Sequence, residues 1–255
     1  MDKECKVQRQ INIIKDLGHE LSPKAMILDL GCGNGDAVMG FINSGYQAYG
    51  CDFSFSNGVH AQDLHEKGLI RKINESPYTL PFPDNTFDVV LSDQVFEHVK
   101  DYASTLAEIS RVLKPEGVGL HYIPSRYSII EQHVYVPLAT LIQQRWWLLL
   151  WAYLGIRKKQ QRGMPAAAVA QRNFDFLRGH TNYLKRSDIV HHFSANFRNI
   201  VFCEDIFIRN NQHSRKSIFL YRLSNVFKFI PKVYSTMRMM VLFSENNKSR
   251  QAGET

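Results

Sequence analysis

The sequence contains little cysteine, no long apolar run and no apolar start. Its four cysteines lie far apart and form no CxxC pair, which disfavours a disulfide scaffold or a zinc ribbon. The most apolar run, residues 146–156, has 11 residues, whereas a membrane-spanning helix needs about 20. The opening residues MDKECKVQRQ are charged, so we expect no secretory signal. These absences predict a reduced, cytoplasmic protein without a membrane span.

Charge is distributed unevenly along a chain of otherwise ordinary globular composition. Of 255 residues, 44% are hydrophobic and 22% are charged, which suits one or two folded domains. Residues 1–123 carry 11 Lys+Arg against 17 Asp+Glu, a net −6, and residues 124–255 carry 20 against 7, a net +13. The basic second half suits an anionic partner such as phosphate, a membrane surface or nucleic acid. Solubility with a basic tail is the simpler alternative.

The first 123 residues alternate short apolar runs with amphipathic segments. We expect strands at 25–30, 46–52, 69–73, 87–92 and 118–123. We expect helices at 36–43, 55–67 and 103–113, with a turn at 114–117. Strands that alternate with helices predict an α/β fold, with helices on both faces of a parallel sheet.

The alternation ends at Pro124. Residues 124–186 are rich in aromatic, proline and basic residues and are predicted to be an insertion. After a helix at 187–193, strands at 200–209 and 217–223 are predicted to form a closing antiparallel hairpin. The remaining residues, 225–255, are predicted to be a basic, apolar tail.

A glycine-rich turn follows the first predicted strand. The strand brings Asp29 to its carboxyl end, and glycines follow at alternate positions, Gly31, Gly33 and Gly35. Glycine permits positive φ and close approach of a ligand to the backbone, and open parallel sheets bind ligands at this edge. Asp52 ends the next strand, where a carboxylate can accept both hydroxyl protons of a ribose. Position 36, where a nicotinamide-binding fingerprint needs glycine, is Asp36, which suits a positively charged cofactor.

Later blocks of sequence extend this pattern. The turn reads DLGCGNG, and the blocks LPFPDNTFDVV (80–90), FEHV (96–99) and RVLKPEG (111–117) follow it in order. Over residues 25–123 the chain resembles the class I S-adenosylmethionine-dependent methyltransferases, in particular their small-molecule, type 11-like branch. The resemblance implies a Rossmann-like, seven-stranded, mostly parallel sheet with helices on both faces, and S-adenosylmethionine as the cofactor. It assigns residues 1–123 and 187–224 to this domain and 124–186 to a helical substrate cap inserted after the fifth strand.

The resemblance also gives roles to residues that match the family's motifs. The residues expected to line the methionine and ribose parts of the cofactor are Asp29, Gly31, Gly33 and Gly35. Asp52 would hold the ribose hydroxyls, with Phe53 beside the adenine. Ser76 stands with Pro77 where the family has an Asp-Ala pair that contacts the adenine amine. Ser92, Asp93 and Gln94 would face the methionine end and the methyl group.

His98 is the first candidate for a catalytic base, because it follows the fourth strand beside Glu97, which could orient it. Packing of a helix against the sheet is the alternative role for this histidine. Some related enzymes bind a divalent metal through ExxEH at this place. Here Gln94 replaces the first carboxylate, which weakens a hard-cation site, so no metal is expected.

Aromatic residues of the insertion would either line an acceptor pocket or form the core of the cap. Residues 138–162 and 226–243 mix basic and apolar side chains, as a peripheral membrane contact would, although a packed tail is also compatible. We expect O-methylation of a small-molecule, glycan or lipid-linked acceptor, including phosphate-bearing ones. Nucleic acid is disfavoured because no RNA-binding module is visible. An RNA or protein methyltransferase and a non-catalytic cofactor-binding module are the alternatives.

Overall fold

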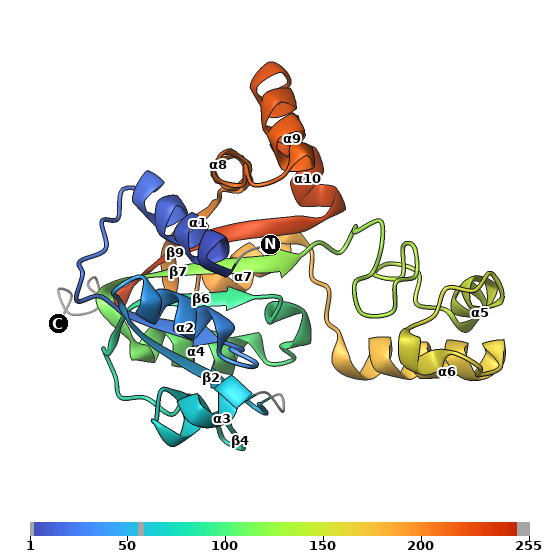
Figure 1. Ribbon diagram of the computed structural model, residues 1–255, viewed down its shortest axis with the longest axis horizontal. Coiled ribbons are helices and arrows are strands. Elements are labelled where there is room, and N and C mark those ends of the chain that lie inside the picture. The colour runs from blue at the N-terminus through green and yellow to red at the C-terminus, as the bar shows by residue number, and fades with distance from the viewer. Residues whose placement is uncertain (1–2, 56–58, 249–255) are drawn as a thin grey trace.

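The computed structural model describes residues 3–55 and 59–248 and contains a seven-stranded sheet (Figure 1). The strands in sheet order are β3 (Ile70–Lys72), β2 (Gln47–Asp52), β1 (Met26–Leu30), β6 (Phe87–Asp93), β7 (Leu113–Pro124), β9 (Met239–Asn246) and β8 (Phe197–Phe202). In this sheet β9 runs antiparallel to both of its neighbours, β7 and β8, and the other adjacent strands are parallel. A separate hairpin pairs β4 (Asn74–Glu75) with β5 (Tyr78–Thr79). The expected seven-stranded, mostly parallel Rossmann-like sheet is therefore confirmed.

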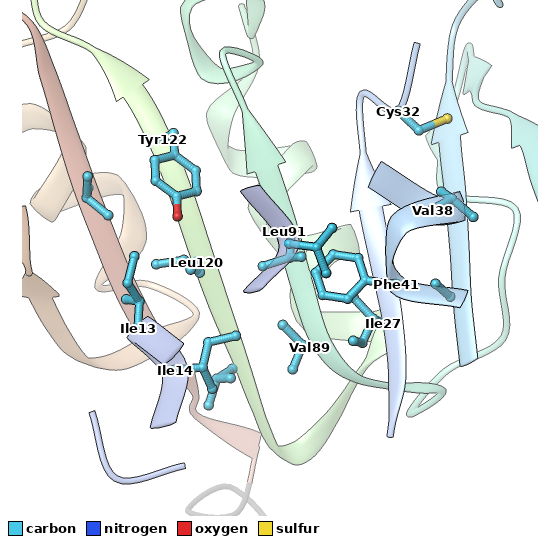
Figure 2. Packing of buried hydrophobic residues seen from close by; sticks show 14 of the residues in the cluster. Ile13, Ile14, Ile27, Cys32, Val38, Phe41, Val89, Leu91, Leu120 and Tyr122 are labelled. Carbon is cyan, nitrogen blue, oxygen red and sulfur yellow. The ribbon is translucent and has the colours of Figure 1, made fainter. Parts of the chain in front are cut away.

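Helices cover both faces of the sheet, as predicted. One face packs against α1 (Lys3–Asp16), α2 (Asp36–Asn43), α3 (Val59–Glu66) and α8 (Glu204–Asn210). Figure 2 shows this core, in which Ile13 and Phe41 of the helices meet Val89 and Leu120 of the strands. The other face packs against α4 (Tyr102–Val112) and α7 (Arg186–Phe193). Successive strand residues point to opposite faces, so both layers bury apolar side chains worth about 1.5–3 kcal/mol each.

The insertion forms a lobe with a small core of its own (Figure 1). It contains α5 (Arg145–Tyr153), the 3-10 helix η2 (Lys159–Gln161) and α6 (Ala166–His180). Four of its aromatic residues pack against this core: Trp147, Trp151, Phe174 and Phe176. Trp146 and Tyr153 are exposed instead. The predicted helical cap is thus present, and its aromatic residues divide between its core and its surface.

The predicted closing hairpin is wrong. Residues 200–209 divide between β8 and α8, and residues 217–223 lie within α9 (Arg215–Val226), whose start is fixed by reciprocal capping between Ser214 and Ser217. The antiparallel strand is β9, which pairs with β7 and β8, belongs to the segment predicted as a tail and follows α10 (Ile230–Met237). The continuous apolar run of β9, MMVLF, is typical of a strand buried on both faces.

Two smaller differences concern segments without a strong periodic signal. Helix α1 was not predicted, and the turn predicted at 114–117 lies within β7. Part of the predicted helix 55–67 lies outside the described residues, and the observed helix α3 begins at Val59.

No helix among residues 3–55 and 59–248 combines the length and the apolar character that crossing a membrane requires.

Asn246 anchors the end of β9 inside the fold. Its side chain is fully buried and accepts a hydrogen bond from the Ser110 hydroxyl. Its amide group donates to the backbone carbonyls of Ser110, Leu113 and Lys114 at 3.0–3.2 Å. This side chain therefore ties the last strand to the junction between α4 and β7.

Replacing Asn246→Ala should lower the free energy of unfolding by about 1–3 kcal/mol, because it leaves buried polar groups without partners. Chemical denaturation followed by circular dichroism measures this change. Asn225→Ala, at an exposed position of α9, is the matched control and should change stability by less than about 0.5 kcal/mol. Equal stability of the two variants would show that β9 is not anchored in this way.

Candidate functional site

The three glycines of the turn between β1 and α2 all adopt positive φ, but they serve two purposes. A Cβ atom on Gly31 would overlap the side chain of Val95, and one on Gly35 would overlap Leu64. A Cβ atom on Gly33, where φ is +54°, would meet nothing within 4 Å. Gly31 and Gly35 are therefore needed for packing, while Gly33 leaves open space where a ligand can reach the backbone.

Asp52 holds this turn against the end of β2. One carboxylate oxygen accepts a hydrogen bond from the backbone N–H of Gly33 at 2.9 Å, and the other accepts from the N–H of Phe53 at 2.7 Å. A carboxylate offers about four acceptor positions, so this group retains capacity for the hydroxyls of a ligand. The structure thus brings Asp52 and the glycine turn together as the sequence predicts.

Phe53 lies next to this carboxylate with an exposed ring. Its side chain is 48% exposed, and its ring centroid lies 6.1 Å from that of Tyr78 in β5. Ser76 occupies the exposed turn between β4 and β5, after which Tyr78 begins the return strand. Ser76 therefore lies two residues before Tyr78, the ring partner of Phe53. In the described structure, no side-chain contact joins Ser76 to the other candidate residues.

Carboxylates gather where β1, β2 and β6 end. Asp29 is 9% exposed, and burial raises its pKa to about 7, against the opposing effect of nearby Lys6. Asp93 and Asp52 raise this pKa further through charge repulsion. Lys6, which belongs to α1, pairs with Asp93 at 2.8 Å. This acidic edge favours a ligand that carries positive charge.

Ser92 does not join this group through its side chain. Its hydroxyl is fully buried and lies 2.8 Å from Nδ1 of His121. Burial lowers the pKa of His121 to about 3, so this histidine is neutral. The His121 ring packs against Phe96 and Phe193, which belong to the face covered by α4 and α7. The Ser92 hydroxyl therefore has a structural contact, and only its backbone lies at the strand end.

Gln94 marks the bend that leads away from β6. Its φ is +58°, its side chain is exposed, and its backbone N–H donates to the carbonyl of Tyr122 at 2.9 Å. The bend places Val95 against Gly31 and leads into the 3-10 helix η1 (Phe96–His98). Residues 94–98 are therefore adjacent to the glycine turn.

Glu97 and His98 both lie at the junction with the cap, but Glu97 does not orient His98. The Nδ1 atom of His98 lies 2.6 Å from the backbone carbonyl oxygen of His180. Glu97 is fully buried, and within the described residues neither of its carboxylate oxygens has a hydrogen-bonding partner. Burial raises the pKa of Glu97 to about 8 and lowers that of His98.

A histidine of the insertion, His133, lies beside His98. Its ring centroid lies 4.8 Å from that of His98, and its Nδ1 atom lies 2.7 Å from the carboxylate of Glu131. Glu131 also accepts a hydrogen bond from the hydroxyl of Tyr183. One coordinating atom each from Glu97, His98 and His133 lie within 4.8 Å of one another. Short-range sequence patterns could not reveal this cluster. His133 precedes the cap helices, whereas Glu97 and His98 follow β6, and Tyr183, which bonds to Glu131, comes after the cap helices.

The chain is similar to known methyltransferases over its first half. Residues 28–120 match the family model of a methyltransferase domain. An uncharacterized methyltransferase of Schizosaccharomyces pombe is 38% identical over 104 residues, which cover 36% of this chain and 37% of that protein. A demethylmenaquinone methyltransferase of Bacillus mycoides is 33% identical over 104 residues, which cover 38% of this chain and 44% of that protein.

A solved structure extends the likeness to the fold as a whole. Phosphoethanolamine N-methyltransferase 2 of Haemonchus contortus, in complex with phosphomonomethylethanolamine and S-adenosylhomocysteine, superposes with a TM-score of 0.52 at 18% sequence identity. The alignment covers 94% of this chain and 52% of that chain. Residues 28–120 thus match a methyltransferase domain, which confirms the resemblance to methyltransferases that the sequence motifs predict. The chain spans less than half the length of the two curated relatives named above.

Asp29 generates a testable pH dependence. The unfolded carboxyl titrates near 3.8 and the folded one near 7, so the folded state binds this proton more tightly. The group therefore costs stability as pH rises from about 4 to 7, on the order of 1.4 kcal/mol per pKa unit. Asp29→Asn should remove this loss, making the unfolding free energy flatter across that range.

Denaturant titrations at several pH values between 4 and 8 measure this difference. Asp63→Asn, at an exposed carboxylate of α3, is the control and should follow the wild-type profile. If Asp29→Asn also follows the wild-type profile, the buried carboxyl does not titrate as described.

Proposed function

We propose that this chain transfers a methyl group from S-adenosylmethionine to a small-molecule acceptor. The observation that carries the proposal is the open backbone at Gly33 beside the carboxylate of Asp52, within a matched methyltransferase domain. Small-molecule chemistry is supported by the relatives, one named as a demethylmenaquinone methyltransferase and one solved with phosphomonomethylethanolamine.

The residues at the strand ends fit the separate parts of this cofactor. Asp52 accepts hydrogen bonds from the ribose hydroxyls, and Phe53 packs on the adenine near Ser76, the candidate contact for the adenine amine. The acidic edge formed by Asp29 and Asp93 compensates the positive ammonium and sulfonium groups. S-adenosylmethionine supplies an electrophilic methyl group, so the protein's main task is to align the acceptor, worth roughly 7–11 kcal/mol.

We assign the acceptor to the segment 94–98, which contacts the glycine turn through Val95 and the cap through His98. An acceptor hydroxyl bonds to the methyl carbon through its oxygen while the carbon–sulfur bond breaks and its electron pair remains on sulfur. The acceptor proton passes to Nε2 of His98, the ring nitrogen that is not engaged by His180. General base catalysis of this kind contributes roughly 10²–10⁴-fold.

Loss of the Asp52 carboxylate tests the cofactor assignment. Asp52→Ala should weaken S-adenosylmethionine binding by about 10–100-fold, because hydrogen bonds to a charged group contribute about 1.5–3 kcal/mol. Isothermal titration calorimetry measures the affinity, and circular dichroism checks the fold. Asp63→Ala is the matched control and should bind like the wild type. Unchanged affinity of Asp52→Ala would remove this residue from the cofactor site.

An exposed basic and apolar surface supports a lipid-linked acceptor. We define the α9–α10 arm as residues 215–237, which project beyond the sheet in Figure 1. Its exposed apolar side chains are Phe219, Val226, Phe227, Phe229, Val233 and Met237. Its exposed basic side chains are Arg215, Lys216, Arg222, Lys228 and Lys232. Such a mixture suits the interface of an anionic membrane.

The side chains of the two regions predicted to contact a membrane differ in exposure. Met240–Phe243, the end of the predicted 226–243 region, is buried in β9 and is not available to a membrane. In the other region, 138–162, the side chains of Trp146, Tyr153 and Leu154 are exposed beside basic residues. The arm is the stronger candidate because α9 contains no buried residue.

Charge reversal tests the membrane contact without removing β9. The double substitution Lys228→Glu and Lys232→Glu should reduce sedimentation with anionic phosphatidylglycerol vesicles by tenfold or more, since each basic residue near the surface contributes about 1 kcal/mol. Lys67→Glu with Lys72→Glu, far from the arm in the sheet order, is the control. Equal sedimentation of both double variants would end the membrane assignment of the arm.

A further inference from the structure

We propose that Glu97, His98 and His133 bind one divalent transition-metal ion, of which Zn²⁺ is the representative, at the junction between the sheet and the cap. One carboxylate oxygen and one nitrogen from each ring lie within 4.8 Å of one another. Glu97 and His98 come from η1 after β6, while His133 comes from the start of the insertion. The ion would therefore join two parts of the chain that are separate in sequence.

The buried carboxylate of Glu97 is the observation that points to a ligand. It has no exposed surface, and neither oxygen has a hydrogen-bonding partner in the part of the chain that the structure describes. Buried carboxyl groups are almost always hydrogen-bonded, paired or metal-bound, because an unpartnered one is costly. A cation between Glu97 and the two imidazoles supplies the missing partner.

The two histidines are held as metal ligands usually are. Nδ1 of His98 faces the carbonyl oxygen of His180 at 2.6 Å, and Nδ1 of His133 faces a carboxylate oxygen of Glu131 at 2.7 Å. An oxygen acceptor fixes the proton on Nδ1, which leaves Nε2 with a free lone pair. Protein oxygens on the second ring nitrogen are the common arrangement around histidine ligands of metals.

Tyr183 and Asn182 stabilise this arrangement from the far end of the cap. The hydroxyl of Tyr183 donates to the same carboxylate of Glu131 that faces His133. The backbone N–H of Asn182 donates to the carbonyl of Glu97 at 2.6 Å, and its side chain donates to the carbonyl of Val99 at 2.9 Å. The backbone around Glu97 and His98 is thus held by Asn182, and the carboxylate that faces His133 is held by Tyr183.

The donor set selects the kind of ion. Two imidazoles and one carboxylate suit Zn²⁺ and its transition-metal neighbours, whereas Mg²⁺ and Ca²⁺ require oxygen ligands. Ligands at about 2.0–2.1 Å around a tetrahedral ion lie roughly 3.3 Å apart, so the three groups must draw together on binding. Three protein ligands leave one position open. The sequence predicted no metal because Gln94 weakens a site for a hard cation within residues 94–98. That prediction did not include His133.

The open position gives the ion a role that rests on the proposed function. An acceptor hydroxyl bound there would have a lowered pKa, so it would release its proton to solvent water before its oxygen attacks the methyl carbon. With the ion bound, Nε2 of His98 is a ligand and no longer the proton acceptor. Methyl transfer should then increase with metal loading, whereas metal binding itself requires neither cofactor nor acceptor.

Titration of the full chain with Co²⁺ alone tests the site, because cobalt in a tetrahedral histidine–carboxylate site absorbs visible light. We expect one Co²⁺ per chain, displaced by Zn²⁺. His133→Ala and Glu97→Gln should each weaken Co²⁺ binding by at least tenfold. His133→Gln keeps an amide that can donate to Glu131 but lacks the imidazole, so it should also lose binding while preserving the fold. His213→Ala, at an exposed histidine, is the matched control and should bind like the wild type.

Unchanged affinity and absorption in folded His133→Gln would overturn the proposal, as would the lack of any one-to-one binding by the wild type. S-adenosylmethionine affinity, measured by calorimetry on the same variants, should stay within about twofold of the wild type. Loss of metal binding with normal cofactor binding would support the metal site. Normal metal binding without methyl transfer would contradict the proposed function and leave the metal site standing.

Discussion

The hydrogen bond from the backbone N–H of Gly33 to the carboxylate of Asp52 is the contact on which the site depends. It joins the turn after β1 to the end of β2 and fixes the turn in its positive-φ conformation. The flanking glycines then allow the next two packing contacts, Gly31 against Val95 and Gly35 against Leu64. Through Val95 the turn also contacts the segment that leads into η1, which contains Glu97 and His98.

Two regions with different titratable side chains lie beside this turn. The strand ends carry the carboxylates of Asp29, Asp52 and Asp93, with Lys6 as a compensating cation from α1. The cap junction carries the cluster of Glu97, His98 and His133. A positively charged methyl donor suits the first region, and an acceptor that must lose a proton suits the second. The region suited to the donor therefore lies at the strand ends, and the region suited to the acceptor lies at the junction with the cap.

The sequence predicted the parts of the fold that depend on local pattern. The strand, glycine turn and helix from Met26 to Asn43 appear almost as expected, since buried strand, positive-φ glycines and amphipathic helix each leave a short-range signal. The order of helices and strands in the C-terminal part was mispredicted, because short apolar segments such as 217–223 and 239–243 are compatible with either a helix or a strand. Their identity depends on tertiary pairing, which places β9 between β7 and β8.

The same limit applies to the site. Asp52 and the glycines were predictable because they lie on consecutive strand ends. Ser92 was expected in the site, but its hydroxyl points inward to His121. The sequence does not show which face of the sheet this side chain occupies. His133 reaches His98 through the folding of the insertion, with Glu131 bonded to its other side, and no spacing in the sequence indicates that contact.

The most direct test of the account uses S-adenosylmethionine with a labelled methyl group, the purified full chain, and a fractionated cell extract. The account predicts label in the small-molecule or lipid fraction. Label confined to RNA or protein would contradict the acceptor class, and no label above a no-enzyme control in any fraction would contradict the proposed methyl transfer.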